Sequence, residues 1–475
     1  MGKKITIEPV TRIEGHAKVT IHLNDAGKVE QAFFHVNEFR GFEKFSEGRP
    51  FYEMPQITER ICGICPVSHH LASAKACDGV AGVEPPRTAS LLRELMHMGQ
   101  IVQSHSMHFF ELAGPDLLLG FDADPAIRNV VGVIQLDPNL ALKAVALRKY
   151  GQEIIRMLGT KRVHPVFAIP GGVNAPLLPE HRDAMLKPLA EMIANVQAGI
   201  AVAKAWYEKN AELVRTFAVF PSGYMGTVGP NGELDLYGGQ LRVVDKTGKK
   251  LAQFDPKDYL QYIGEHVEDW SYLKFPYYRP LGWPGGTYRV GPLGRLNVCD
   301  SIPTPLAQAE FKVFKQLNGG RPVENTLYFH YARLIEDLYA LERIGQILDE
   351  RDICSTDIYT PYATLTGEGV GCIEAPRGTL IHHYHTDPNG QLTKVNLIVA
   401  TGHNNWAMSE SVRAVARDFV DGNHLTEGML NRIEAAIRAH DPCLSCATHA
   451  VGQMPLEVIV YGPDGAEVNR LARLT

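Results

Sequence analysis

The chain has 475 residues, 45% of them hydrophobic, so it can bury a large core in one elaborated domain or two. Its formal net charge is only −6 and it has no basic block, so nucleic acid is not an expected partner. Eight cysteines, no apolar leader after Met1 and no membrane-spanning apolar run favour a soluble cytoplasmic protein over a secreted or membrane protein.

The first predicted elements are strands. Residues 17–23 and 29–36 have strand character, and the turn residues between them predict a hairpin. Glu14 precedes this hairpin and Glu43 follows it, each close to an arginine. Taken alone, both glutamates are expected to be solvated or salt-bridged, because charged side chains are mostly exposed.

Long helices are predicted next, beginning with one that starts at Pro66, a residue suited to a first helical position. The further predicted helices cover residues 88–112, 140–158, 179–214, 305–316, 324–348, 409–419 and 427–439. The helix over 88–112 is expected to break at Gly114-Pro115. His105 and His108 share a face of it, and their apolar neighbours favour packing or hydrogen bonding over metal binding.

Residues 218–300 are rich in glycine and aromatic residues and predict an irregular α+β insertion, with a strand at 241–244. Further strands are predicted at 395–399 and 456–461. No G-x-G-x-x-G or Walker A pattern occurs, so a nucleotide site on this chain is not expected. The predicted fold is α+β, mainly α, with a central bundle of long helices and small peripheral sheets.

Two C-x-x-C motifs, called the first and second clip below, lie near opposite ends of the chain, and each is followed by a histidine. The first clip is Cys62 and Cys65, followed by His69, and the second clip is Cys443 and Cys446, followed by His449. Four soft thiolates suit a transition metal, and two separate chelates explain why the chain must bring its ends together. A single C-x-x-C also occurs in redox dithiols and zinc knuckles. A structural Cys₄ zinc site is the alternative, disfavoured because such sites usually close short loops.

The combination R-x-C-G-x-C-x-x-x-H with D-P-C-x-x-C-x-x-H resembles the large subunit of nickel–iron hydrogenases over nearly the whole chain. It looks closest to the cytosolic NAD-reducing, or bidirectional, branch. The sequence resembles that branch at residues 40–45, 170–174, 274–277, 305–308 and 441–450. The resemblance implies reversible heterolytic cleavage of hydrogen. It further implies a nickel held by all four clip cysteines, with Cys65 and Cys446 bridging to an iron that carries carbon monoxide and cyanide.

The resemblance also implies catalytic roles. Cys443 is a candidate base for the proton, and Glu14 would relay that proton outward. Arg377, with Asp116 as its partner, would polarise or position hydrogen, since an arginine is a poor base. Arg377 and Thr401 would donate hydrogen bonds to the cyanides. Without the resemblance, Arg377 would be read as an exposed turn residue.

Two further sets of residues follow from the resemblance. His69 would hydrogen-bond a bridging sulfur and tune its electronics. Glu43, His449 and the carbonyl of Leu397 match a magnesium site, although a histidine ligand is less typical of this hard cation.

The resemblance finally implies processing and partners. A maturation protease would cut between His449 and Ala450 after nickel-insertion factors have loaded the metal, leaving a domain of residues 1–449 and removing 450–475. The alternative is that residues 456–461 form the last strand of the mature fold. A small subunit with iron–sulfur clusters and FMN-containing diaphorase subunits would pass electrons to NAD. A metal-free relative from a respiratory complex is the competing assignment, and the four retained cysteines argue against it.

Overall fold

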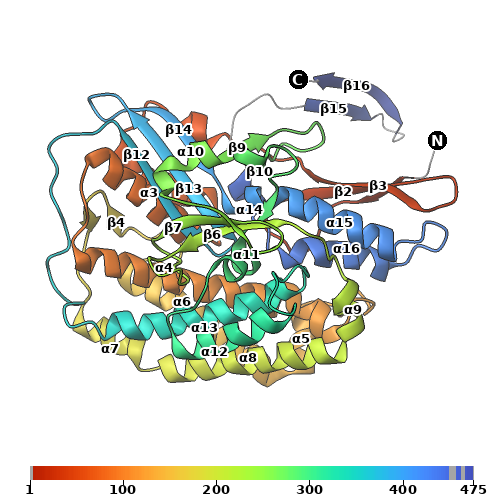
Figure 1. The fold of residues 1–475 in the computed structure, drawn as a ribbon, viewed down its shortest axis with the longest axis horizontal. Helices are drawn as coiled ribbons and strands as arrows, with labels where there is room; N and C mark the ends of the chain where they lie inside the picture. Colours follow the sequence, from red (N-terminus) through yellow and green to blue (C-terminus); the bar gives the residue numbers. More distant parts are fainter. Residues whose placement is uncertain (1–3, 449–455, 462–465, 474–475) are drawn as a thin grey trace.

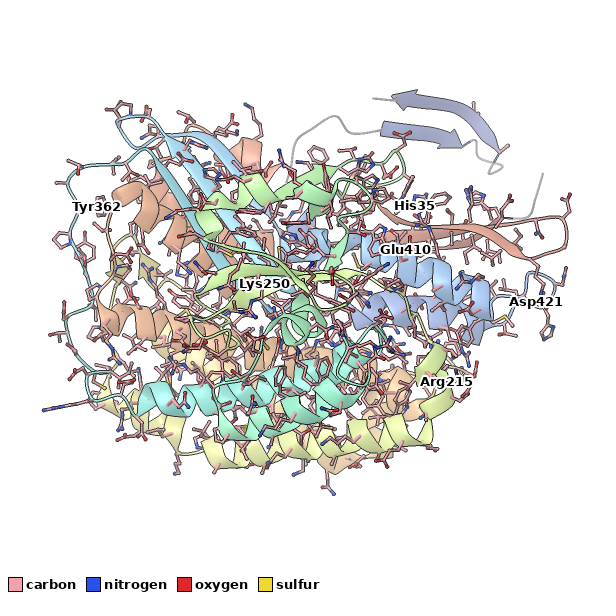
Figure 2. All side chains as sticks on the ribbon, in the orientation of Figure 1. His35, Arg215, Lys250, Tyr362, Glu410 and Asp421 are labelled. Atoms are coloured by element: carbon pink, nitrogen blue, oxygen red, sulfur yellow. The ribbon has the colours of Figure 1, made fainter. Side chains whose placement is uncertain are left out.

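Long helices form one layer of the molecule, as the sequence predicts (Figure 1). The computed structural model describes residues 4–448, 456–461 and 466–473. The main helices of this layer are α4 (Arg87–Met107), α6 (Pro138–Gly159), α8 (Leu189–Lys209), α12 (Pro305–Gln316) and α13 (Tyr328–Leu348). Apolar side chains of all five belong to the largest buried core, and side chains fill the space between the layers (Figure 2). The predicted mainly helical α+β class is confirmed.

Two helix predictions differ from the structure. The single helix predicted over 179–214 is divided into α7 (Pro179–Leu186), α8 and α9 (Ala211–Thr216). Pro188 separates α7 from α8, because it lacks the N–H that a continuous helix needs, and α8 ends at its C-cap residue Asn210. The break predicted at Gly114-Pro115 is absent. The chain instead continues through two π-helical segments, η3 (His108–Ala113) and η4 (Pro115–Leu119), which bury Asp116.

The N-terminal sheet has the order β1-β2-β3 and is antiparallel throughout. Its strands are β1 (Lys4–Ile7), β2 (Ala17–Leu23) and β3 (Val29–Val36), so the predicted hairpin is confirmed. It packs beside α15 (Asn405–Phe419) and shares a core with α16 (Glu427–Ala439). Glu14 therefore lies in the loop between β1 and β2.

A second antiparallel sheet, β12-β13-β14, packs on α3 (Pro66–Ala81). Its strands are β12 (Glu368–Ala375), β13 (Gly378–Thr386) and β14 (Leu392–Ile398). Glycines obscure β12 in the sequence, yet they permit its close approach to the helix. A Cβ on Gly369 would lie 2.0 Å from the Ala76 carbonyl oxygen, and one on Gly371 would lie 2.0 Å from that of Ala72.

Residues 218–300 contain a four-stranded sheet of order β11-β6-β7-β8. It is formed by β6 (Gly223–Val228), β7 (Gln240–Val244), β8 (Lys250–Phe254) and β11 (Tyr288–Arg289), with β11 parallel to β6. The same region holds α10 (Tyr259–Tyr262), β9 (Ile263–His266), β10 (Phe275–Tyr278) and α11 (Gly291–Val298). Its apolar side chains share a core with β12, β13 and β14.

The remaining elements are short connections and a terminal hairpin. The connections are α1 (Phe42–Ser46), α2 (Met54–Thr58), α5 (Val130–Leu136), β4 (Ala168–Ile169), β5 (Gly172–Val173), α14 (Ala400–His403) and α17 (Leu444–Ala447). Strands β15 (Leu456–Tyr461) and β16 (Glu467–Arg473) pair with each other and stand apart from the main body (Figure 1). In the described part of the chain, no helix has the length and apolar character needed to cross a bilayer.

Candidate metal centre

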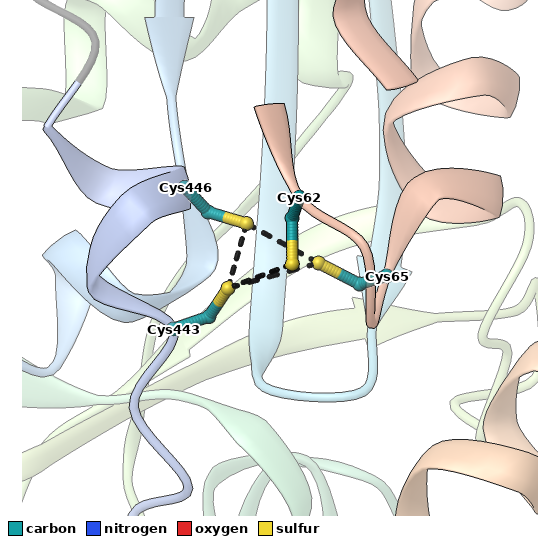
Figure 3. A group of neighbouring side chains, drawn as sticks. All are labelled: Cys62, Cys65, Cys443 and Cys446. Carbon is teal, nitrogen blue, oxygen red and sulfur yellow. Dashed lines mark hydrogen bonds between the residues drawn. The ribbon is translucent and has the colours of Figure 1, made fainter. Parts of the chain in front are cut away.

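The two clips meet although more than 370 residues separate them, and their four sulfurs form one buried cluster (Figure 3). The Sγ atoms of Cys62 and Cys443 are 3.2 Å apart, and those of Cys65 and Cys446 are 3.3 Å apart. Cys443 Sγ also lies 2.8 Å from that of Cys446 and 4.0 Å from that of Cys65. All four are free thiols. The predicted convergence of both chain ends is therefore confirmed.

The first clip is built into the start of α3. Cys62 follows a short helical turn in extended backbone, and its Sγ accepts the N–H of Ile64 at 3.2 Å. Cys65 is the N-cap of α3 and Pro66 its first residue, as the sequence predicts. The partial positive charge of the helix N-terminus acts in favour of a thiolate at Cys65. Hydrogen bonds with Cys443 and Cys446 also lower the pKa of this thiol, but the contact with Cys62 and burial raise it, and the net pKa lies above its ordinary value.

The second clip is reached through a tight turn after α16. Asp441 takes a left-handed conformation with φ 55°, which aspartate tolerates better than most residues. The Cys443 N–H donates to Thr401 Oγ1 at 2.9 Å, and Cys443 forms an isolated parallel β-bridge with Glu14. One Glu14 carboxylate oxygen accepts the N–H of Ser445 at 3.1 Å. Contacts from distant segments therefore fix this clip.

The electrostatics of the cluster favour a bound cation. The hydrogen bond from Cys443 lowers the pKa of the Cys62 thiol well below its ordinary value. Burial instead raises the pKa values of Cys443 and Cys446 well above theirs. Four thiolates in a buried space repel one another, so the protein alone does not stabilise the fully ionised set. A metal ion supplies the positive charge that permits all four to be ligands.

Arg377 lies in the site, but its predicted partner is wrong. Its side chain is 2% exposed, which excludes the exposed-turn alternative, and its Nη2 donates to Asp441 Oδ1 at 3.0 Å. Asp116 instead accepts from Arg12 at 2.5 Å and from Arg438, because the π-helical segment turns it toward α16. The sequence had a signal for Asp441: it lies two residues before Cys443 in the D-P-C motif.

The charge of Arg377 is strongly favoured where it lies. Burial alone would lower the pKa of this guanidinium, but the facing Asp441 and the sulfurs of Cys443, Cys65 and Cys62 raise it well above its ordinary value. Arg377 therefore supplies a permanent positive charge beside the four sulfurs. Its Nη1 also lies 3.5 Å from Ser104 Oγ of α4.

A second buried arginine, missed by sequence reasoning, holds the segment before Arg377. Arg295 donates to the carbonyl oxygens of Ala375 at 2.8 Å and Pro376 at 3.2 Å. Two carboxylates compensate the charge of Arg295. A Glu374 oxygen lies 2.9 Å from Arg295 Nη1, and a Glu336 oxygen lies 2.6 Å from Arg295 Nε. Arg295 lies in α11, far from any clip in the sequence, so no local motif reveals this role.

His105 of α4 and His108 of η3 contact other protein groups rather than the cluster. His105 Nε2 lies 2.9 Å from a Glu336 carboxylate oxygen, and His108 Nε2 lies 2.7 Å from the Arg438 carbonyl oxygen. Both side chains are buried. The interpretation of these residues as packing and hydrogen-bonding groups is confirmed.

The structure brings several other predicted residues near the clips. His69, one turn after Cys65 in α3, is buried and its Nδ1 lies 3.2 Å from His382 Nε2. Glu43 and Leu397 meet directly, because the Leu397 N–H donates to a Glu43 carboxylate oxygen at 2.7 Å. His449, the third predicted magnesium ligand, and the predicted cleavage position after it lie outside the described residues.

The donor set fits a nickel–iron pair. Nickel and low-spin iron prefer soft thiolates, and a buried cluster of four excludes the oxygen-rich surroundings of a hard cation. Arg377 Nε and Asp441 Oδ2 are buried and have no hydrogen-bond partner among the described residues. A buried unsatisfied group costs about 1–3 kcal/mol, so a small diatomic ligand that accepts a hydrogen bond from Nε would remove that cost.

The fold is mainly helical α+β, and four buried thiols meet from both ends of the chain. Together these features define the class of protein, one with a thiolate-held transition-metal centre. Comparison with known proteins gives the family. The profile of the nickel-dependent hydrogenase family matches residues 40–126 and 237–449, and a HoxL-like profile matches residues 4–39. The chain belongs to this family, as the large subunit of a nickel–iron hydrogenase, which is an oxidoreductase.

Individual relatives support this assignment over full length. The chain is 46% identical to the beta subunit of the NAD-reducing hydrogenase HoxS of Cupriavidus necator, covering 100% of both chains. It is 47% identical to one subunit of the vhu F420-non-reducing hydrogenase of Methanococcus voltae, covering 88% of this chain and 98% of the relative.

Solved structures agree. An NAD⁺-reducing [NiFe]-hydrogenase in the H₂-reduced state superposes with a TM-score of 0.92 at 46% identity, covering 94% of this chain and 99% of the other. The Ni-Fe-Se hydrogenase of D. vulgaris Hildenborough shares the fold, with a TM-score of 0.75 at 24% identity, covering 94% and 100%. The zinc and metal-free alternatives are not favoured.

Proposed function

We propose that this protein catalyses reversible heterolytic cleavage of hydrogen with NAD⁺ as the final electron acceptor. The observation that supports this proposal most strongly is the buried four-thiol cluster, in a chain that is 46% identical over its whole length to one chain of an NAD-reducing hydrogenase. F420-non-reducing relatives have similar identity, so we assign the choice of electron acceptor to partner subunits. Hydrogen-dependent NAD⁺ reduction by the purified complex tests this. Hydrogen uptake with artificial dyes but never with NAD⁺ would contradict the acceptor and leave the hydrogenase assignment intact.

The proposed cofactor is a nickel–iron pair that Cys62, Cys65, Cys443 and Cys446 would hold. When bound, this group supplies a Lewis-acidic centre that polarises hydrogen and accepts its electron pair. We propose carbon monoxide and cyanide as further iron ligands. The unpartnered Nε of Arg377 supports a hydrogen bond to one cyanide, and the hydroxyl of Thr401, beside the Cys443 N–H, supports one to another.

We assign the proton path to Cys443 and Glu14. The Cys443 sulfur would take the proton first, as a soft base within the cluster. Glu14 would receive it, because its carboxylate is fixed against the second clip by the Ser445 N–H at 3.1 Å and is half-buried between the cluster and solvent. A carboxylate so placed can exchange a proton without moving its backbone.

Arg377 would act by charge and position, with Asp441 in the partner role once expected of Asp116. The Arg377–Asp441 bond of 3.0 Å holds a permanently charged guanidinium at the cluster. Such a charge polarises hydrogen and favours the anionic side of the heterolytic split. His69 would tune a bridging sulfur from α3, and its contact to His382 fixes the ring orientation that this requires.

We propose a magnesium site formed by Glu43, the Leu397 carbonyl and His449. The contact between the Glu43 carboxylate and the Leu397 backbone supports the first two ligands. Magnesium retains water and needs few carboxylates, which suits a single glutamate. Magnesium analysis of the purified complex, with Glu43→Gln as the variant, tests the site. A Glu43→Gln complex with unchanged magnesium would contradict it.

Electrons must leave through partner subunits. In the described part of the chain, Cys77, Cys299, Cys354 and Cys372 belong to no group of metal-ligating side chains. We therefore propose a small subunit with iron–sulfur clusters next to the thiolate centre, and diaphorase subunits with FMN that reduce NAD⁺. All eight cysteines are free thiols, which supports a reducing cytoplasmic location.

We propose that residues 450–475 are removed by a maturation protease after nickel-insertion factors have acted, leaving a domain of residues 1–449. Two observations support this. Thr448, the last described residue before the cut, is buried and accepts the Arg40 N–H at 2.6 Å, whereas β15 and β16 pair only with each other in their sheet. The intact mass of the active large subunit tests the proposal, and an active chain ending at Thr475 would contradict it.

A further inference from the structure

One more group of side chains in the described ranges carries metal-binding donors. Glu368, His383 and His385 present a carboxylate oxygen and imidazole nitrogens that all lie within 4.8 Å of one another. The group lies at one end of the β12-β13 ladder. None of its members belongs to the hydrogenase centre or to the magnesium site proposed above.

The sheet itself holds these donors together. His383 and His385 are two residues apart in β13, so their side chains project from the same face. Glu368 of β12 is directly opposite His385 in the antiparallel register. The intervening Tyr384 projects to the other face, where its hydroxyl donates to Ser73 of α3 at 2.8 Å. Regular strand geometry, rather than a loose loop, therefore sets the arrangement.

His383 is oriented as metal-binding histidines usually are. Its side chain is buried, and its Nδ1 lies 3.0 Å from the Tyr259 hydroxyl, which itself accepts from Asn396 Nδ2 at 2.6 Å. A second hydrogen bond of this kind fixes the ring and leaves the other nitrogen to bind metal. That nitrogen, Nε2, faces Glu368 Oε1 at 2.8 Å.

The other two donors leave room for an incoming ion. The Glu368 side chain is 60% exposed, and the rings of His383 and His385 lie with centroids 4.5 Å apart. Lys394 is opposite His385 in the β13-β14 register, so a cation at this site also meets a positive neighbour. Two nitrogens and one carboxylate oxygen, with a position open to water, form a donor set typical of zinc rather than of calcium or magnesium.

We propose that Glu368, His383 and His385 bind a zinc ion that bridges the ends of β12 and β13. The site is independent of the hydrogenase centre. His385 lies eight residue steps along the strand from Arg377, a span of about 26 Å at roughly 3.3 Å per step. The ion would replace the single His383–Glu368 hydrogen bond by three ligand bonds across the ladder.

Zinc titration of the purified hydrogenase complex, first dialysed against EDTA, tests the proposal. Calorimetry with ZnCl₂ is expected to show one saturable equivalent per large subunit. His385→Ala and Glu368→Gln each remove one ligand and are expected to weaken binding at least about tenfold. His424→Ala removes an exposed histidine elsewhere and is expected to leave the affinity unchanged. No saturable equivalent, or the same affinity in His385→Ala, would overturn the proposal.

A spectroscopic probe separates a true site from a change in folding. Co²⁺ is expected to give visible absorption bands of a three-ligand site in the wild-type complex, displaced by one equivalent of ZnCl₂. Tyr259→Phe keeps all three ligands but loses the hydrogen bond to His383, so weaker Co²⁺ binding with unchanged band shape supports the positioning role. Bands that persist in the Glu368→Gln, His385→Ala double variant would overturn the assignment.

Discussion

The two cysteine clips have the same spacing but are held in different ways. The first leads directly into α3, a 16-residue helix packed against the β12-β13-β14 sheet. The second spans only the four-residue α17 and its N-cap, and it depends on Glu14, Thr401 and the Asp441–Arg377 pair. The first clip is thus part of the core, whereas the second is docked onto it by long-range polar contacts.

This difference indicates how the centre is completed. A clip within the core can form as the domain folds, whereas a docked clip closes the site when its partners are in place. The proposed removal of residues 450–475 falls three residues beyond Cys446, on the docked side. The geometry of the second clip is therefore linked to maturation, and the following substitutions test this link.

Cysteine substitutions are expected to have the largest effect. Cys446→Ser replaces a soft ligand by a hard one, so nickel content and hydrogen uptake should both fall below detection. Cys65→Ser should do the same, because both clips supply ligands to one centre. Cys354→Ser, outside the cluster, is the matched control and should retain both. Full activity in Cys446→Ser would separate the second clip from the centre.

Glu14→Gln should separate the role of Glu14 in holding the second clip from its role in proton transfer. The amide can still accept the Ser445 N–H, so the second clip and its nickel should remain. Loss of the carboxylate should slow hydrogen–deuterium exchange by about 10²–10⁴-fold, the usual contribution of acid–base catalysis. Glu30→Gln, at an exposed position on β3, is the control. Unchanged exchange in Glu14→Gln would remove this residue from the proton path.

Arg377→Lys should reduce hydrogen uptake by about 10²–10³-fold, the typical effect of removing one preorganised electrostatic donor. Lysine keeps the charge but loses the forked geometry that faces both Asp441 and the cluster. Asp441→Asn keeps the size of the partner and should have a smaller effect. Nickel content separates the two causes: if it falls with activity, Arg377 is needed for docking rather than for catalysis.

Gly371→Ala tests the platform under the first clip and should have the smallest effect on chemistry. The new Cβ would lie 2.0 Å from the Ala72 carbonyl oxygen, so α3 and β12 must separate. We expect a loss of about 1–3 kcal/mol in stability, measured by denaturant unfolding of the complex. Gly345→Ala is the control, because its Cβ meets only the end of the Leu189 side chain at 3.0 Å. Equal stability of both variants would contradict tight packing of α3 on β12.

Local sequence signals predicted the elements that have a clear hydrophobic periodicity or clear start and stop residues. Strands 17–23 and 29–36 and helices 305–316 and 427–439 match the structure residue for residue. The glycines of β12 hid a strand, because their purpose is close packing against α3 rather than local propensity. The π-helical continuation after α4 was missed because Gly114-Pro115 is ordinarily a helix stop.

The residues of the metal centre divide in the same way, into those with a local sequence signal and those without one. The C-x-x-C spacing reveals ligands, because a chelate is local in sequence. The choice of Asp441 over Asp116 as the partner of Arg377, and the support of Arg377 by Arg295, depend on long-range contacts that no motif encodes. His69 lies in the first turns of α3, Thr401 accepts the Cys443 N–H, and Glu43 accepts the Leu397 N–H, but their individual roles stay predictions.

X-ray absorption at the nickel edge of the purified complex tests most directly whether both clips hold one nickel with an iron neighbour. The expected spectrum has a first shell of sulfur ligands drawn from both clips and an iron atom in the next shell, and loses sulfur neighbours in either Cys65→Ser or Cys446→Ser if any nickel remains. A nickel with nitrogen and oxygen ligands, or four sulfurs around zinc alone, would contradict the account.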